Sequence, residues 1–326
     1  MKKILAIGSL FALVSCLPAT ALAQAPSFSP SRPVTAVAPY EPGGPVDIEG
    51  RMYTKKATEL TGQQFIMEYK TGAGTRIGVG YVARAVPDGH TLLITNASFT
   101  VFPALYKDLP FDTLKDFAPV SQMSIKTNVL VIRASFPAKN FAEYIAYARA
   151  NPGKINFAML GSGSTTHMVV AWLSNVTNTK VTLVPYKGGG PAMVDVVAGR
   201  VDAYTPALIA GMPFIKSGKV RPIGVLTGSR SKLFPDLPTI AEQGAPGLEW
   251  LNWTGFLAPR AVPAATLARL NDIFDKVAHA PDIVALADTL GNVMVGGSSE
   301  PFAKLIAAET TRWRKLAQDN NIQPEE

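Results

Sequence analysis

Four loops rich in glycine and hydroxyl residues could bind an anion. They are PYEPGGPVD at 39–47, LITNASFT at 93–100, MLGSGSTTH at 159–167 and VPYKGGGPAM at 184–193. Each follows an expected strand and leads into an expected helix. The first turn of a helix has unpaired N–H groups and a partial positive charge, and glycine lets that backbone approach an anion closely. We therefore expect these loops to hold a small anion.

Capping of the following helix is the alternative interpretation of any one loop. Ser164, Thr165 or Thr166 could simply accept hydrogen bonds from the first N–H groups of the helix. For a single loop, capping is the commoner role. Several such loops in one chain, all at expected strand ends, favour anion binding.

Familiar catalytic and phosphate-binding motifs are absent from the sequence. There is no GxxxxGK[ST] segment, and the lysine of YKGGGP precedes the glycines instead of following them. No GxSxG elbow occurs, because the serines of GSGST are in the wrong frame. The sequence has no HExxH motif and no tight Asp/His cluster, so no segment indicates a metal site. We expect no cofactor and no metal, although an acid/base pair between Asp47 and a distant carboxylate stays open.

Composition indicates a globular protein that could bind small anions. The chain has 326 residues, of which 47% are hydrophobic and 17% charged, and this suits two core-forming domains. The formal net charge is +7, and it falls to +5 without Lys2 and Lys3. Because the positive charges are dispersed, we expect mild attraction for anions and no nucleic-acid partner.

The first residues predict export. Lys2 and Lys3 precede the apolar stretch ILAIGSLFALV, and ALA at 21–23 has small residues where signal peptidase cleaves. We predict a signal peptide over residues 1–23. LVSC at 13–16 is an alternative, lipobox-like site that would leave Cys16 lipidated. Cleavage after residue 23 leaves a mature chain without cysteine, which excludes disulfides and a cysteine nucleophile.

Short apolar strands alternate with helices along the chain, which is typical of an α/β fold with parallel sheets. Strands are expected at 34–39, 65–69, 91–95, 128–133, 155–159, 181–185, 201–205, 220–226 and 252–257. Helices are expected at 47–61, 77–85, 140–150, 166–177, 191–198, 207–216, 265–279 and 299–320.

Two extended segments, 117–133 and 244–263, follow proline-punctuated loops and predict crossings between two domains. The first lobe would then be discontinuous, with residues 27–126 and 250–326, and the second lobe would hold residues 127–249. Ligands of open α/β sheets bind outside the carboxyl ends of strands. We therefore expect a ligand cleft between the lobes.

The sequence resembles the solute-binding proteins of tripartite tricarboxylate transporters, known as the Bug family. The resemblance covers nearly the whole mature chain. It rests on the segments VAPYEPGGPVDIEGR, TGAGTRIGVGYVARAVPDGHTLL, PALYKDLPFDTLKDFAPVS, GSGSTTH, VPYKGGGPAMVDVVAGRVDAY, IKSGKVRPIGVLT, FPDLPTIAEQG and GFLAPRAVPAATLARLN. None of these segments is specific alone, but together they are.

The resemblance implies a periplasmic binding protein type II-like fold, with two α/β lobes joined by two crossing strands. It also implies a monomeric periplasmic receptor that closes on a small organic carboxylate without chemical turnover and delivers it to transporter membrane subunits. Backbone N–H groups, hydroxyls and water would hold the carboxylate. The expected ligand-binding residues are Tyr40, Gly43, Gly44, Pro45, Val46, Asp47, Ser98, Ser162, Ser164, Thr165, Thr166 and Thr205.

Four positions depart from the usual family pattern, namely Glu41, Pro45, Arg76 and Thr205. Thr205 stands where the family often has Asp. A carboxylate at this position would repel an anion 4 Å away by about 1 kcal/mol in water, and Thr205 removes this repulsion.

Large rings in or near the expected loops favour an aromatic dicarboxylate such as terephthalate as the ligand. These rings are Tyr40, Phe99, Phe102 and Trp253. The alternative is that they belong to the core.

Two other functions stay open at this point. One is a secreted α/β hydrolase-like enzyme on the same scaffold, with Ser164 and His167 as reactive groups. The other is a sensor subunit of a membrane signalling system.

Overall fold

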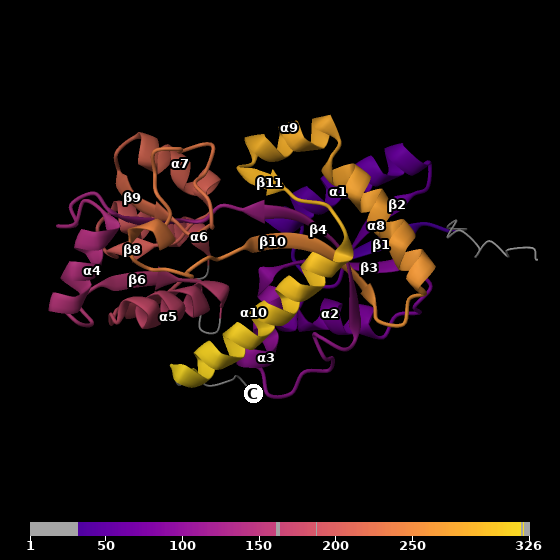
Figure 1. The fold of residues 1–326 in the computed structure, drawn as a ribbon, viewed down its shortest axis with the longest axis horizontal. Helices are drawn as coiled ribbons and strands as arrows, with labels where there is room; N and C mark the ends of the chain where they lie inside the picture. The colour runs from indigo at the N-terminus through magenta and orange to yellow at the C-terminus, as the bar shows by residue number, and fades with distance from the viewer. Residues whose placement is uncertain (1–31, 161–163, 187, 321, 323–326) are drawn as a thin grey trace, which may run out of the picture.

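A computed structural model describes residues 32–160, 164–186, 188–320 and 322. The chain forms two α/β lobes, each built around one sheet (Figure 1). The expected two-lobe α/β fold is therefore confirmed. The predicted signal peptide, Cys16 and Ser162 lie outside the described residues.

The first sheet has the strand order β11-β4-β10-β3-β1-β2. β1 is parallel to β2 and β3, whereas β10 is antiparallel to β3 and β4 because it returns from the second lobe. The sheet is thus mixed, not wholly parallel as expected. Its strands are β1 (Val34–Ala38), β2 (Phe65–Tyr69), β3 (Thr91–Asn96), β4 (Phe117–Lys126), β10 (Asn252–Pro259) and β11 (Asn292–Met294).

The helices of the first lobe follow local signals in the sequence. Pro45 occupies the first position of α1, and Gly62, in the left-handed conformation, ends it. On α8, Leu270, Phe274 and Val277 recur at helical spacing and are buried. The helices are α1 (Pro45–Thr61), α2 (Arg76–Ala83), α3 (Phe102–Leu105), α8 (Ala264–Ala278), α9 (Pro281–Thr289) and α10 (Ser299–Asp319), with 3-10 turns η1 (Ala73–Thr75) and η2 (Ala97–Val101).

The second sheet has the order β7-β6-β8-β5-β9. β6 is parallel to β7 and β8, and β5 is antiparallel to β8 and β9, so this sheet is also mixed. The strands are β5 (Val129–Arg133), β6 (Asn156–Met159), β7 (Thr182–Pro185), β8 (Ala203–Tyr204) and β9 (Val220–Val225). The helices are α4 (Phe141–Ala150), α5 (Thr165–Thr177), α6 (Gly189–Val197) and α7 (Leu208–Lys216), with the 3-10 turn η3 (Ala241–Gln243).

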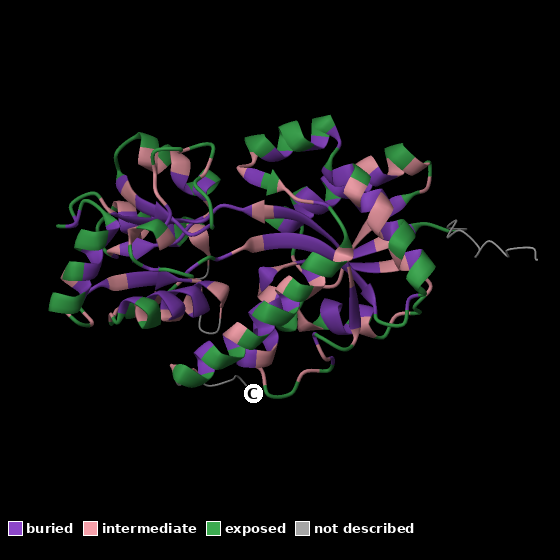
Figure 2. Cartoon of the chain, viewed as in Figure 1, coloured by how far each residue is buried: buried purple, intermediate pink, exposed green. Residues whose placement is uncertain are grey.

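The strands and helices expected from the sequence are present, with ends within two residues of those expected. Figure 2 shows that the strands of both sheets are mostly buried, whereas the helices combine buried and exposed residues. Within the described ranges, no helix is long and apolar enough to cross a bilayer.

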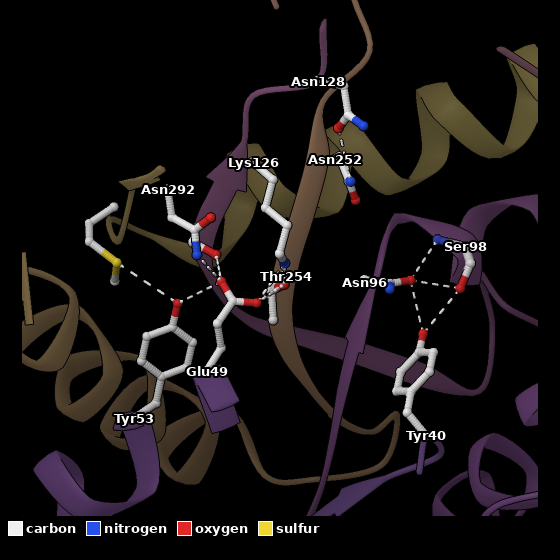
Figure 3. Close-up of polar contacts among 12 residues, drawn as sticks. Tyr40, Glu49, Tyr53, Asn96, Ser98, Lys126, Asn128, Asn252, Thr254 and Asn292 are labelled. Carbon is white, nitrogen blue, oxygen red and sulfur yellow. Dashed lines mark hydrogen bonds and ion pairs between the residues drawn. The ribbon is translucent and has the colours of Figure 1, made fainter. Parts of the chain in front are cut away.

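The chain crosses between the lobes at two neighbouring places. The first crossing is Thr127–Asn128, between β4 and β5, and the second leads into β10. Asn252 Nδ2 donates to Asn128 Oδ1 at 3.0 Å and ties the two crossings together (Figure 3). The second sheet draws its strands from residues 129–225 only. The domain boundaries given above stay a prediction.

A buried ion pair anchors the crossing strands to α1. Lys126, the last residue of β4, donates to Glu49 Oε2 and to Thr254 Oγ1, both at 2.5 Å (Figure 3). The other carboxylate oxygen, Oε1, accepts from Ser124 Oγ at 2.6 Å and from Asn292 Nδ2 at 2.7 Å. Glu49 is 1% exposed. One carboxylate therefore links α1 to β4, β10 and β11.

Candidate ligand-binding site

Asp47 shapes the loop that enters α1. Its carboxylate accepts hydrogen bonds from Gly43 N at 2.7 Å, Tyr69 Oη at 2.5 Å and Arg51 Nε at 2.7 Å. Burial alone would raise the pKa of Asp47, but these hydrogen bonds outweigh it and the pKa lies below its ordinary value. Asp47 is therefore ionised at neutral pH and holds the loop. Its bonds to the loop and to its neighbours make ligand contact a secondary role.

The backbone of this loop faces outward with few side chains in the way. Gly43 has φ +85°, which is strained for any residue with a Cβ. Gly44 precedes α1 without a side-chain cap, and Pro45 and the buried Val46 begin the helix. The first turn of α1 thus has N–H groups without a side-chain cap, and its anion-binding role stays a prediction.

A second cluster lies at the end of β3 (Figure 3). Asn96 Oδ1 accepts from Tyr40 Oη at 2.9 Å, from Ser98 N at 3.0 Å and from Ser98 Oγ at 2.7 Å. Tyr40 Oη also lies 3.1 Å from Ser98 Oγ and from Thr95 Oγ1. Burial raises the pKa of Tyr40, although the hydrogen bonds to Ser98 and Thr95 act against it. Tyr40 is therefore a neutral phenol, and the predicted residues Tyr40 and Ser98 are in contact.

In the second lobe, Ser164 caps α5. Its Oγ accepts from His167 N at 3.2 Å and lies 2.8 Å from Thr166 Oγ1. Thr166 Oγ1 also accepts from Leu160 N at 2.8 Å and fixes the start of the loop after β6. The capping interpretation is thus correct for Ser164. Thr165 is partly exposed in the same turn.

Thr205 follows β8 and has a buried hydroxyl without a partner. The residue is 1% exposed, and its Oγ1 has no hydrogen-bond partner in the described part of the chain. An unsatisfied buried hydroxyl costs about 1–3 kcal/mol, so Thr205 Oγ1 is suited to a ligand oxygen.

The strand order places the loops of each lobe at the same edge of its sheet. β1 and β3 are parallel, so the loops that follow them meet, and β6 and β8 are parallel in the same way. Asn128 lies at the crossing and donates from Nδ2 to the carbonyl of Thr205 at 3.2 Å. The predicted residues of each lobe thus follow neighbouring parallel strands, and their joint role in binding a ligand stays a prediction. Thr95, Asn96 and Asn128 were missed, although Thr95 and Asn96 lie within the quoted LITNASFT loop.

The described groups at these loops are mainly neutral donors. Partial burial lowers the pKa of His167 below its ordinary value, so this side chain is uncharged at neutral pH. The described part of the chain contains no group of three or more His, Cys, Asp or Glu residues placed to hold a metal ion. Such an arrangement can bind an anion through hydrogen bonds.

Three of the four rings expected beside the ligand belong to the core instead. Phe99 and Trp253 are fully buried, Phe102 is 4% exposed, and all three lie in one hydrophobic cluster. Phe99 packs edge-on against Phe102 with centroids 6.2 Å apart. The expectation that these rings face a ligand was wrong, because η2, α3 and β10 each direct their ring into the core of the first lobe. Of the four, Tyr40 is half-buried at the loop edge.

Arg76, another departure from the family pattern, is engaged locally. Its guanidinium lies 3.9 Å from the centroid of the Tyr106 ring, and its Nε donates to Ala73 O at 2.8 Å. An open cavity of about 460 Å³ is lined by Tyr106, Thr113, Asp116 and Arg314 among others, and by none of the predicted site residues. We give this cavity no part in the site, because no strand-to-helix loop of the clusters above reaches it.

Comparisons with known proteins agree with this geometry. Residues 50–322 match the family model described as tripartite tricarboxylate transporter family receptor. A relative from Pseudomonas sp. (strain P51), the UPF0065 protein in the tcbD-tcbE intergenic region, is 39% identical over 288 residues, which cover 88% of this chain and 86% of the relative.

Two solved structures of similar proteins contain dicarboxylates. R. palustris Rpa4515 with adipate is 31% identical, with a TM-score of 0.77, and the match covers 91% of this chain and 99% of that chain. MatC from Rhodopseudomonas palustris with bound malate is also 31% identical, with a TM-score of 0.73, and the match covers 88% and 99%. The fold of this chain is thus that of proteins crystallised with small carboxylates.

Proposed function

Because the chain belongs to the tripartite tricarboxylate transporter receptor family, we propose that it is a periplasmic receptor for a small organic carboxylate. It would deliver that ligand to the membrane subunits of a tripartite tricarboxylate-type transporter. The observation that carries the proposal is the pair of hydrogen-bonding clusters, one per lobe, at the carboxyl ends of parallel strands. The buried, unpartnered Thr205 Oγ1 belongs to the second cluster.

Capture follows from hydrogen bonding without chemical turnover. One carboxylate is held by the first turn of α1 and by the Tyr40–Asn96–Ser98 cluster of lobe 1. The first turn of α5 and Thr205 contribute the remaining hydrogen bonds from lobe 2. Charge-assisted hydrogen bonds from fixed donors are stronger than neutral ones, and helix N-termini add favourable dipoles. Ser164 acts as a helix cap here, which favours binding over the hydrolase alternative.

The ligand that we propose is a short aliphatic dicarboxylate. Relatives of similar fold carry adipate and malate in their structures. An aromatic acid such as terephthalate stays a second candidate, supported now by Tyr40 alone, because the other three rings are core. Neutral Thr205 suits a dianion better than a carboxylate would.

Export and a monomeric state are part of the proposal. Support comes from the leader-like first residues, with Lys2, Lys3 and the apolar run that follows them. N-terminal sequencing of the mature periplasmic protein should give Gln24. A lipidated Cys16 in the membrane fraction would contradict this cleavage site.

Isothermal titration calorimetry with adipate, malate, terephthalate and succinate tests the proposed function. We expect saturable binding of at least one acid and no consumption of it over hours. At ~100 times its dissociation constant, the bound acid should stabilise the fold by roughly 2.7 kcal/mol. Failure of all four acids to bind, or formation of a product, would contradict a carboxylate receptor.

A further inference from the structure

Glu309 on α10 is a buried carboxyl between α10, the crossing strand β10 and the turn η2. It is 1% exposed, and its Oε2 accepts from Trp253 Nε1 at 2.9 Å and contacts Thr100 Oγ1 at 3.2 Å. Trp253 belongs to β10, the strand that returns from the second lobe. Thr100 belongs to η2, the turn that also carries Ser98. The carboxyl thus touches a crossing strand and a ligand loop at once.

The same cluster reaches α5, the helix capped by Ser164. Trp313, one turn after Glu309, donates from Nε1 to Thr100 Oγ1 at 3.1 Å. Its ring packs edge-on against Trp172 of α5, with centroids 5.8 Å apart. In Figure 1, α10 runs from the first lobe alongside α3 towards α5. A continuous set of contacts therefore connects the Ser98 turn to the second-lobe helix.

The hydrogen-bond inventory of Thr100 favours one protonation state of Glu309. The Thr100 hydroxyl has one hydrogen and accepts from Trp313, so it can donate to either Ala97 O, at 2.8 Å, or Glu309 Oε2. With a carboxylate at Glu309, one of these two bonds lacks its proton. With a protonated carboxyl, Glu309 donates to Thr100 and Thr100 donates to Ala97, so both bonds form. The neutral form therefore closes the turn that carries Ser98.

Few other titratable or charged groups surround this carboxyl. β10, η2 and α3 contribute none, since their sequences contain no Asp, Glu, Lys, Arg, His or Tyr. β4 contributes Lys126, which is paired with Glu49, and α5 contributes His167 in its first turn. Tyr106 follows α3, and Arg312 lies on α10 itself. Burial raises the pKa of Glu309 to about 7, against the lowering effects of Trp253, Arg312 and Thr100.

We propose that Glu309 is a positioning residue that, by taking up a proton, sets the Ser98 turn and its link to α5 in the ligand-binding arrangement. This inference rests on the proposed function for its effect on affinity, but the protonation site does not. Ligand capture is then tightest when Glu309 is neutral, and it weakens as the pH rises through the pKa of Glu309. Glu309→Gln removes the titrating group, and its amide can keep one of the two contacts of Oε2, either with Trp253 through its oxygen or with Thr100 through its nitrogen.

The four tryptophans provide a ligand-independent test. Indole N–H signals are followed by NMR from pH 5.5 to pH 8.5, with Trp172→Phe and Trp250→Phe used for assignment. We expect Trp253 and Trp313 to shift with a common midpoint, while Trp250, whose indole N–H has no hydrogen-bond partner among the described residues, stays fixed as the internal control. The backbone amides of 98–101 should titrate at the same midpoint.

Glu309→Gln should abolish this titration, both in the indole N–H signals and in the amide signals of 98–101. If the indole N–H signals of Trp253 and Trp313 in the wild type do not change with pH, the inference is overturned. It is also overturned if Glu309→Gln shows the same titration as the wild type. A third contrary result is that the indole signals change with pH while the backbone amide signals of 98–101 do not, because Glu309 would then not control the turn. The wild-type result stands even if the variant does not fold.

Adipate is the probe for the effect on affinity, measured by calorimetry at pH 6.5 and pH 8.5. We expect the wild type to bind at least about threefold more tightly at pH 6.5, and Glu309→Gln to bind equally at both. Equal wild-type affinity at both pH values would overturn the coupling. If adipate binds at neither pH, adipate is not the ligand, and the indole and amide titrations alone decide on Glu309.

Discussion

A buried hydroxyl without a partner has opposite effects on an empty and an occupied receptor. In the empty protein, Thr205 Oγ1 lacks a hydrogen-bond partner among the residues that the structure describes, which costs free energy of folding. In the occupied protein, the same oxygen would hold the ligand. We expect Thr205→Val to raise the free energy of unfolding of the empty protein by about 1 kcal/mol and to weaken adipate binding about threefold to tenfold.

Thr113→Val is the matched control for this prediction. Thr113 is 3% exposed, and its Oγ1 also lacks a partner among the described residues, but it belongs to none of the predicted ligand loops. This variant should gain similar stability and keep its affinity. Denaturant unfolding and calorimetry check both variants. Loss of stability in Thr205→Val with unchanged affinity would contradict a ligand role.

Asp47 gives a prediction with a defined pH dependence. Its pKa in the folded protein lies below 3.8, so its stabilising effect is present above that value and is lost as the pH falls through the folded pKa. We expect Asp47→Asn to lower the free energy of unfolding by about 1–3 kcal/mol at pH 7 and by less at pH 3.

Glu300→Gln serves as the control for Asp47→Asn. Its exposed ion pair with Lys304 should contribute little to stability at either pH. Urea unfolding at both pH values measures the two variants. An equal loss for Asp47→Asn at pH 3 and pH 7 would show that the charge of Asp47 does not hold the loop.

The rings show what sequence alone could and could not predict about the site. The loop segments were identified because glycine and hydroxyl residues follow apolar strands, a local pattern. Whether Phe99 faces ligand or core depends on the direction of η2, where Asn96 caps the turn and sets its orientation. That direction is a tertiary property, so the ring of Phe99 was misplaced, and the ligand roles of Tyr40 and Ser98 stay predictions.

At the scale of elements, the crossing strands depend on one buried charge pair. Lys126→Met would leave Glu49 uncompensated, and we expect a loss of about 3–5 kcal/mol in the free energy of unfolding. Adding Glu49→Gln should restore part of this loss, because the amide keeps partners in Ser124 and Asn292 without a buried charge. Guanidinium unfolding of both variants measures this. A loss below about 1 kcal/mol for Lys126→Met would show that Glu49 is effectively solvated.

Most elements could be predicted from hydrophobic periodicity, and the exceptions have physical reasons. The strand Asn292–Met294 and the helix Pro281–Thr289 are short and carry exposed apolar residues such as Val293 and Leu286, so periodicity gives no clear signal. The antiparallel placement of β10 follows from its return path through the second lobe. Pairing across more than a hundred residues leaves no local pattern in the sequence.

At the scale of the whole molecule, the donors are divided between two lobes that meet at two neighbouring crossings. Asn128 and Asn252 connect these crossings, and α10 adds a third contact through Trp313 and Trp172. Such an arrangement is suited to hinge closure, in which ligand binds one lobe and then draws in the other. The lobe boundaries proposed from the sequence place the hinge at these same residues.

Small-angle X-ray scattering with and without saturating carboxylate tests the central claim most directly, since a ligand that bridges both clusters must bring the lobes together. The ligand is the acid that binds most tightly by calorimetry, and Thr205→Val at a non-saturating concentration serves as the comparison. We predict a smaller radius of gyration for the bound wild type, and a smaller decrease for the variant at equal ligand concentration. An unchanged radius at saturation would contradict a receptor that closes on its ligand.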